Sequence, residues 1–386
     1  GIATMTQGCE DSSTTSHASR DKTLLEHFQQ HFARDPDAQE LIDLVDAFMS
    51  VTSGTSAARH GVMGLQQEEN DWHFSRDNYQ YMECFSPMML DKLMTICGKE
   101  RIRISTPVKR LIDSPSTNEI QVMVDSSSEP ILADHVIVTV PISMMRKTAR
   151  EVPFADEQLE FEPQLPFEKQ QVLNSKLLME GSVKVTVQLS HDVFHAMPYF
   201  AKTTLFFFTD ELISQCWFLP VRKDTSKCLI AGFTTGEKVD QWTKEQKDGG
   251  SGMQAQRTLV QIFLKQLDKL HQAMVQEQIA HQPELASKWN KLPKPSSLYE
   301  KGHMRNWTNT PYVRGAYSCS GLNALNARHV LARPCWQGKL MFAGEATVSH
   351  ACGTVHGALE SGRRAALEVC RELSQKQSPH AIQSKL

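Results

Sequence analysis

The chain has 386 residues, more than the roughly 250–300 residues that one hydrophobic core supports, so two interleaved domains are expected. Hydrophobic residues make up 40% and charged residues 22%, the composition of an ordinary globular protein. The balance of 41 basic and 44 acidic side chains gives a net charge of −3, which argues against a nucleic-acid-binding role, and no apolar run approaches the roughly 18–20 residues of a membrane span.

The N-terminal part predicts two helices. The first has apolar residues at Leu24, Leu25, Phe28 and Phe32 and is broken by Asp35-Pro36. The second covers about 41–48, with Gly54 just past its end. An acidic group follows at Glu68, Glu69 and Asp71, which could attract a polycation or belong to a solvated loop.

Strand patterns dominate the middle of the chain. Alternating or continuous apolar residues predict strands at 101–104, 120–124, 136–140, 182–189, 203–208, 213–219 and 228–234. A charged loop at 235–252 precedes helices at 253–270 and 273–290. A short buried strand at 339–343 and a helix at 354–373 close the pattern. The nine cysteines contain no C-x-x-C spacing, so no metal site is expected.

The C-terminal helix carries small residues every four positions, at Ala358, Gly362 and Ala366. This spacing predicts a stripe of nearly bare backbone that another backbone or a flat ligand can approach. Gly353 precedes the first turn, where unpaired N–H groups favour a ligand that gains negative charge. Glu345 follows the strand at 339–343 and can accept a hydrogen bond from a ribose or a ring; the alternative is a tightly packed helix with an incidental glutamate.

Several segments together resemble the flavin-dependent amine oxidases, most of all their polyamine oxidase branch. The C-terminal string F-A-G-E-A-T…G-T-V-H-G-A-L…S-G-R-R-A-A is similar to the flavin-binding signature of that family. Residues 104–112, 134–141 and 311–318 resemble further family segments in the same order, and the likeness spans about residues 80–373.

The resemblance implies an α/β fold in which an FAD-binding, glutathione-reductase-like domain, incomplete at its N-terminus, is interleaved with an α+β substrate domain. The implied substrate-domain segments are 1–80, which is helical, and 151–310, which has a mixed or antiparallel sheet with helices. The implied FAD-domain segments are 81–150 and 311–375, and 376–386 forms a tail.

The resemblance also implies site residues. Lys184 matches the lysine that holds a water near the flavin, and Tyr317 matches an aromatic wall that guides the amine; solvated-face and buried-core roles are the alternatives. These two are the expected catalytic residues. The expected cofactor-binding residues are Val108, Trp307, Gly344, Glu345, Gly353, Thr354 and Val355. Ala316 stands where some relatives carry a cysteine bonded to the cofactor, so FAD is expected to be non-covalent.

The implied reaction oxidises a free or acetylated polyamine at its α-carbon to an imine, which hydrolyses to an aldehyde and a shorter amine, while dioxygen is reduced to hydrogen peroxide. The terminal Ser384-Lys385-Leu386 is an address read by the peroxisomal import receptor, so a peroxisomal enzyme is expected. The partners are then a small amine, dioxygen and that receptor.

The chain's largest departure from the family is that it contains no G-x-G-x-x-G turn to cradle the FAD pyrophosphate. A fragment that lacks an N-terminal segment is therefore expected. Two alternatives remain open: an amine oxidase directed at amino acids or peptidyl-lysine, or an inactive truncated chain unable to hold FAD.

Overall fold

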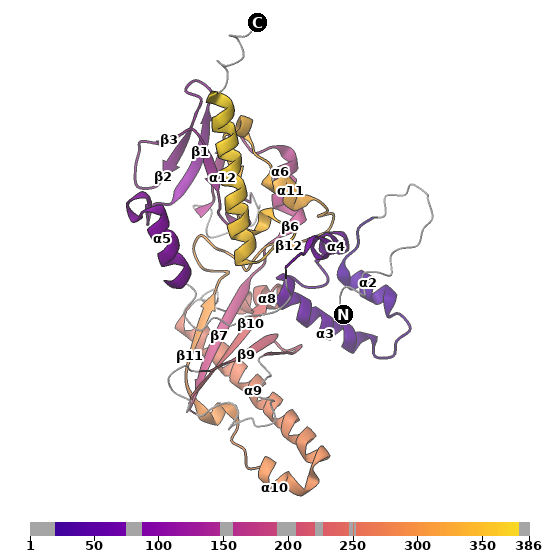
Figure 1. Cartoon of the computed structure of the whole chain (residues 1–386). Coiled ribbons are helices and arrows are strands. Elements are labelled where there is room, and N and C mark those ends of the chain that lie inside the picture. Colours follow the sequence, from indigo (N-terminus) through magenta and orange to yellow (C-terminus); the bar gives the residue numbers. More distant parts are fainter. Residues whose placement is uncertain are drawn as a thin grey trace. The chain divides into compact units, whose positions relative to one another are not determined.

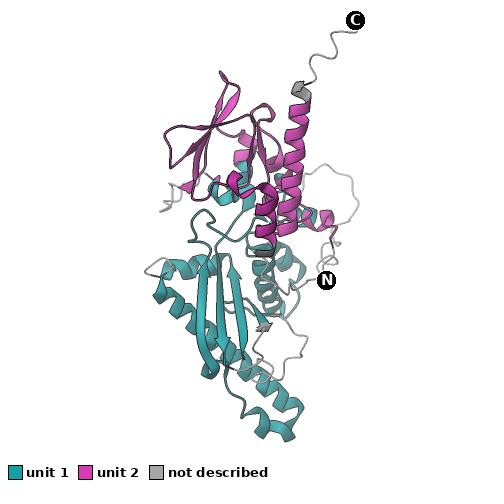
Figure 2. Cartoon of the chain, turned by 60° about the vertical axis from the view of Figure 1, so that its left-hand side comes forward, with its two compact units in different colours: residues 1–67, 141–144, 171–327 teal, residues 68–140, 145–170, 328–386 magenta. Residues whose placement is uncertain are grey.

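A computed structural model describes residues 20–74, 87–146, 157–190, 206–220, 227–246, 250 and 252–377. The chain divides into two compact units, shown in teal and magenta in Figure 2. Unit 1 comprises residues 1–67, 141–144 and 171–327, and unit 2 comprises 68–140, 145–170 and 328–386. Residues 151–170 belong to unit 2 and residues 311–327 belong to unit 1, in each case the other unit from the one expected.

The two predicted N-terminal helices are confirmed in unit 1. α2 (Leu24–His31) starts with a capping box, in which the Thr23 hydroxyl accepts from the Glu26 N–H and the Glu26 carboxylate accepts from the Thr23 N–H. α3 (Ala38–Ser53) ends at Gly54, whose φ of 80° is the left-handed conformation of a helix C-cap. α4 (Val62–Asp71) follows, so the acidic residues predicted in a loop form its last turn.

The core of unit 1 is an antiparallel five-stranded sheet in the order β11-β7-β10-β9-β8 (Figure 1). Its strands are β7 (Ser182–Leu189), β8 (Phe206–Phe208), β9 (Gln215–Pro220), β10 (Cys228–Thr235) and β11 (Tyr299–Asn306). One face of β7 presents fully buried Val183, Val185, Val187 and Leu189, which pack into a cluster with the long helix α9 (Met253–His281). The opposite face therefore carries Lys184 and its neighbours at even positions.

The prediction of a charged loop at 235–252 is wrong, because α8 (Glu237–Glu245) is a helix. Val239 and Trp242, three residues apart, are its buried positions, and the charges occupy its other faces. The predicted second helix at 273–290 is the continuation of α9 followed by the short α10 (Ala286–Trp289). Within the described residues, no helix is both long and apolar enough to cross a bilayer.

A small two-stranded sheet explains why 311–327 belongs to unit 1. β12 (Cys319–Ser320) pairs with β6 (Leu177–Leu178), just before β7. The Ala316 N–H also donates to the Glu180 carbonyl at 2.8 Å. Both contacts join the segment after β11 to the start of the five-stranded sheet.

Unit 2 contains a four-stranded sheet in the order β3-β2-β1-β5. Its strands are β1 (Val108–Ser114), β2 (Glu119–Val124), β3 (Ile131–Ala133) and β5 (Glu160–Glu162), and the parallel pairing of β5 with β1 places 157–170 in this unit. The strand predicted at 101–104 is wrong. Ile102 and Ile104, the apolar residues of the predicted alternation, are exposed, Ile104 by 80%. The strand begins only at Val108. The remaining helices include α5 (Lys92–Cys97), α6 (Phe167–Gln171) and α11 (Ala327–Ala332).

The predicted strands near 136–140 and 339–343 are confirmed as a parallel pair, β4 (Val136–Val138) and β13 (Leu340–Phe342). β13 is buried throughout, whereas in β4 only Val138 is buried. Helix α12 (Val355–Gln377) packs on β13, and its Ala365 joins Met341 and Ala343 in a buried cluster. The small residues of α12 that are buried are Gly357, Ser361 and Ala365. Each lies one position before a residue of the predicted stripe of Ala358, Gly362 and Ala366. A Cβ at Gly357 would lie 2.1 Å from the Ala351 carbonyl oxygen, whereas a Cβ at Gly362 would meet no atom of the described residues within 4 Å.

Candidate functional site

The loop between β13 and α12 in unit 2 holds four of the predicted cofactor-binding residues, and a fifth, Val355, begins α12. It begins at Gly344, whose φ of 120° favours glycine, and the Gly344 N–H donates to the Ser361 hydroxyl at 2.8 Å. Among the described residues, the atom within 4 Å of a Cβ built on Gly344 is the Thr139 carbonyl oxygen, at 3.8 Å.

Glu345 closes this loop onto the start of α12. Its carboxylate accepts the Gly353 N–H at 2.8 Å, and Gly353 has a positive φ of 68°. The Thr354 hydroxyl accepts the Gly357 N–H at 3.1 Å and donates to the Ala351 carbonyl at 2.7 Å. Val355, the first residue of α12, is 52% exposed. The predicted residues therefore surround the positive end of a long helix.

A buried ion pair in the same unit was missed from the sequence. The Arg328 Nε donates to the Glu68 carboxylate at 2.8 Å, with side chains 3% and 12% exposed. Because this carboxylate is paired inside the protein, Glu68 is not available to attract a polycation. Burial raises the pKa of the neighbouring Cys352 thiol to about 12, and the Arg328 charge partly opposes that rise. Arg328 also donates to the Ala346 carbonyl, so the Arg328–Glu68 pair is bonded to the loop between β13 and α12.

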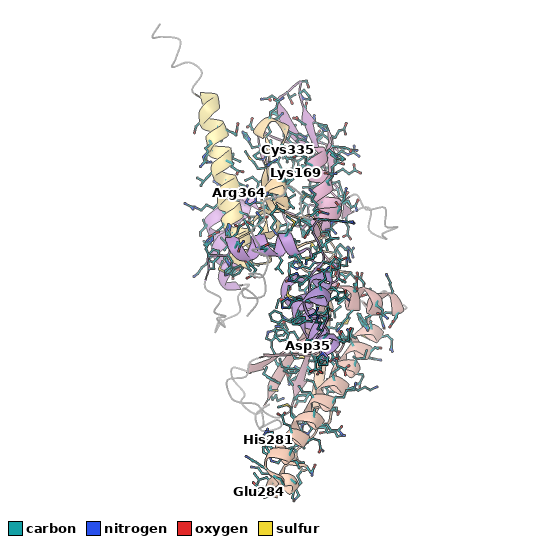
Figure 3. All side chains as sticks on the ribbon, turned by 90° about the vertical axis from the view of Figure 1, so that its right-hand side faces the viewer. Asp35, Lys169, His281, Glu284, Cys335 and Arg364 are labelled. Carbon is teal, nitrogen blue, oxygen red and sulfur yellow. The ribbon has the colours of Figure 1, made fainter. Side chains whose placement is uncertain are left out.

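Lys169 is a second buried cation of unit 2. Its ammonium donates to the carbonyls of Val330, Leu331 and Arg333 at 2.6–3.0 Å and lies 4.0 Å from the centre of the Phe342 ring. Burial lowers the pKa of Lys169 to about 8. Figure 3 shows Lys169 near Cys335, beside the helix that carries Arg364. All three ammonium hydrogens are used within the protein, so Lys169 has a structural role.

Val108 is the remaining predicted cofactor residue of unit 2. It begins β1 and is 37% exposed, and Ile104 and Val140 of the same unit are also exposed apolar residues. At the start of α12, the exposed Val355 and the positive end of the helix suit an apolar ligand with an electron-rich edge.

Lys184 lies in unit 1, in the middle of β7. Its cross-strand partners are Phe233 on β10 and Arg305 on β11. The Lys184 ammonium lies 5.0 Å from the centre of the Trp217 ring, and the Trp217 and Phe233 rings are 6.1 Å apart. The Lys184 side chain is exposed on this face, and partial removal of its ammonium from water by neighbouring groups lowers its pKa. The sheet face opposite the core thus combines a cation with two aromatic rings.

Trp307 and Tyr317 belong to the same unit as Lys184. The backbone N–H of Trp307 donates to the Ser182 carbonyl at 2.9 Å, and the centre of the Trp307 ring lies 5.2 Å from the Arg305 guanidinium. The Tyr317 hydroxyl donates to the Val51 carbonyl at 2.5 Å, and its ring packs against Gly54. Tyr317 is therefore held through its hydroxyl at the end of α3.

The predicted site residues thus fall into two groups. Lys184, Trp307 and Tyr317 belong to unit 1, and Val108, Gly344, Glu345, Gly353, Thr354 and Val355 belong to unit 2. The structure joins Glu345 directly to Gly353, and it attaches Trp307 to the strand that carries Lys184. The Arg328–Glu68 pair has no sequence signal, because its members stand 260 residues apart.

Comparison with known proteins identifies the class. The model of the family described as flavin containing amine oxidoreductase matches residues 5–370, and the chain belongs to this family. Among solved structures, cyclohexylamine oxidase from Brevibacterium oxydans IH-35A is similar, with a TM-score of 0.66 and 16% identity over 94% of this chain and 70% of that chain. No curated protein matches.

The family supplies the general chemistry. Its members are flavin-containing oxidoreductases of amines, so a flavin, an amine and an electron acceptor such as dioxygen are implied for this chain. The residues at the start of α12 fit the part of a flavin that gains negative charge: the helix N-terminus favours that charge, and Val355 beside it is an exposed apolar side chain.

Proposed function

We propose that the protein is a polyamine oxidase that uses non-covalent FAD. It oxidises free or acetylated polyamines to an aldehyde and a shorter amine with release of hydrogen peroxide. Bound FAD would accept the two electrons of the amine and pass them to dioxygen. The family match supports the amine oxidation, and the likeness of several segments to the polyamine oxidase branch supports the substrate class.

The observation that carries this proposal is the outward face of the unit 1 sheet. Lys184 lies over Trp217 and opposite Phe233, so a cation and aromatic rings share one surface. Aromatic rings bind the methylene chain and the ammonium groups of a polyamine. The lowered pKa of Lys184 makes its neutral form, which can accept a proton, accessible at a lower pH than for an ordinary lysine.

The residues around the predicted cofactor site have complementary roles. Gly344 lets the ligand approach the ends of β4 and β13, and the first turn of α12 orients its electron-rich edge. Glu345 and the Arg328–Glu68 pair hold the intervening loop in shape. Trp307 and Tyr317 supply aromatic surface in unit 1.

We also propose a peroxisomal location. The support is the terminal tripeptide Ser384, Lys385 and Leu386, which lies outside the described residues. A fluorescent protein fused at the N-terminus leaves this terminus free, and punctate signal that coincides with catalase is expected. Diffuse signal unchanged by deletion of the three residues would contradict the location.

One experiment tests the activity. Purified chain is incubated with FAD and desalted, its flavin absorbance is recorded, and hydrogen peroxide is measured with spermine, N-acetylated spermine, cyclohexylamine and free amino acids. We expect a retained flavin band and peroxide release with the two polyamines. Turnover of cyclohexylamine alone would favour a monoamine oxidase, and turnover of amino acids alone would favour the amino-acid-directed alternative. A folded, colourless and inactive chain would contradict the proposal.

A further inference from the structure

Three side chains of unit 2 that are far apart in sequence come together beside the start of α12. They are His73, just after α4, His350, in the loop before α12, and Glu360, in the second turn of α12. Their potential ligand atoms all lie within 4.8 Å of one another. We propose that they bind one divalent transition-metal ion, Zn²⁺, through two histidine nitrogens and one carboxylate oxygen.

His73 is oriented as a metal ligand would be. Its Nδ1 lies 3.2 Å from the Asp71 carbonyl oxygen, so an Nδ1–H donates to that oxygen. This hydrogen bond fixes the tautomer in which Nε2 carries the free lone pair, an arrangement common among metal-binding histidines. The His73 ring also packs on Phe74, with 4.5 Å between ring centroids, which restricts its rotation.

His350 and Glu360 complete the set. The His350 Nε2 lies 2.8 Å from the Glu360 carboxylate, and the His73 and His350 rings are 4.7 Å apart with an angle of 31° between their planes. In the metal-free protein a proton on the His350 Nε2 bridges to Glu360. A bound ion would take the place of that proton between the two side chains.

The donor atoms favour zinc over hard cations. Zinc binds histidine nitrogen and carboxylate oxygen at about 2.0–2.2 Å, which places tetrahedral ligand atoms about 3.3 Å apart. Small side-chain rotations bring atoms now within 4.8 Å to that spacing. Calcium and magnesium prefer all-oxygen sites. Because the side chains of His350 and Glu360 are 28% and 47% exposed, a water can fill the fourth position.

The site would stiffen the loop that carries Gly353. His350 lies three residues before Gly353, whose N–H is held by Glu345. An ion held by His73, His350 and Glu360 ties the end of α4 to this loop and to α12. Its role is to position the loop, and it takes no direct part in the reaction.

Metal analysis tests the site without any activity measurement. Untagged chain is stripped with a chelator and dialysed against micromolar zinc, and bound zinc is counted; Co²⁺ is titrated in parallel to detect the visible bands of tetrahedral coordination. We expect about one zinc per chain. His350→Gln and Glu360→Gln should each weaken zinc binding at least about tenfold and remove the cobalt bands.

His356→Gln is the matched control. His356 lies in the same neighbourhood, with its ring 4.4 Å from Phe74 and 6.1 Å from Trp72, but it is not one of the three ligands. This variant should bind zinc as the parent chain does. Circular dichroism checks that each variant is folded. No zinc on the folded parent, or unchanged zinc on folded His350→Gln and Glu360→Gln, would overturn the proposal.

Discussion

The Glu345 carboxylate accepts the Gly353 N–H at 2.8 Å, and this single bond closes the loop between β13 and α12. Gly353 adopts φ 68°, so the turn depends on a glycine. The bond also places a negative charge at the positive end of α12. Glu345 and Gly353, which were both predicted to contact a cofactor, are therefore hydrogen-bonded to each other.

Glu345→Ala should weaken flavin binding about tenfold, because a charge-assisted hydrogen bond that shapes the loop is lost, a net effect of about 1.5 kcal/mol. Glu345→Gln keeps an oxygen acceptor and should lose less. Flavin fluorescence titration measures both. Equal affinity of Glu345→Ala and the parent would show that the loop keeps its shape without this bond.

Lys184→Met should reduce amine oxidation by about 100-fold or more, because a side chain that can accept a proton is replaced by an apolar one. Steady-state peroxide release measures the effect, with flavin content recorded to show that the cofactor is retained. Lys301→Met is the matched control, since Lys301 is an exposed lysine on the neighbouring strand β11, paired with Gln188 of β7. Equal loss in both variants would contradict a specific role for Lys184.

Arg328→Met should destabilise unit 2 by about 3–5 kcal/mol, because it leaves the Glu68 charge buried and unpaired. Urea unfolding followed by tryptophan fluorescence measures the loss. Lys109→Met breaks the more exposed Lys109–Asp125 pair, with side chains 28% and 54% exposed, and should cost less than about 1 kcal/mol. Similar losses in the two variants would mean that burial does not determine the strength of the Arg328 pair.

Lys169 should make stability depend on pH in the alkaline range. Its pKa in the folded chain is about 8, below the ordinary lysine pKa of 10.5, so between these pH values the unfolded chain binds the proton that the folded chain has released. Unfolding free energy should therefore rise with pH from about 8 to 10.5, by at most about 3 kcal/mol.

Urea unfolding at pH 7.5 and 9.5 compares the parent chain with Lys169→Met, which removes this titration. Lys169→Met loses three hydrogen bonds to carbonyls and should be less stable at both pH values. The rise in stability between the two pH values should be smaller in the variant. An identical pH dependence would show that Lys169 titrates alike in the folded and unfolded chains.

Local patterns predicted much of the secondary structure. The alternation at 182–189 gave the bounds of β7 because one face of that strand is fully buried. The same kind of alternation failed at Ile102 and Ile104, since it does not reveal whether apolar side chains find a partner. Helix α8 was missed because only Val239 and Trp242 mark its buried face.

The site was only partly predictable. The loop from Gly344 to Val355 is contiguous, so its motif was visible in the sequence. The Arg328–Glu68 pair and the cluster of His73, His350 and Glu360 depend on long-range folding, which no spacing rule describes. The buried small residues lie one position before the predicted stripe, because Gly357 packs where a Cβ would lie 2.1 Å from the Ala351 carbonyl oxygen.

The parallel pairing of β4 with β13 has a consequence for synthesis of the chain. β13 leaves the ribosome about 200 residues after β4, and all of unit 1 from Gln171 to Ala327 is made between them. During that interval the apolar strand Val136–Val138 has no partner from β13, and such unpaired strands favour aggregation. We therefore expect nascent chains stalled before residue 340 to bind chaperones, and unit 2 to become resistant to protease only when its last segment has emerged.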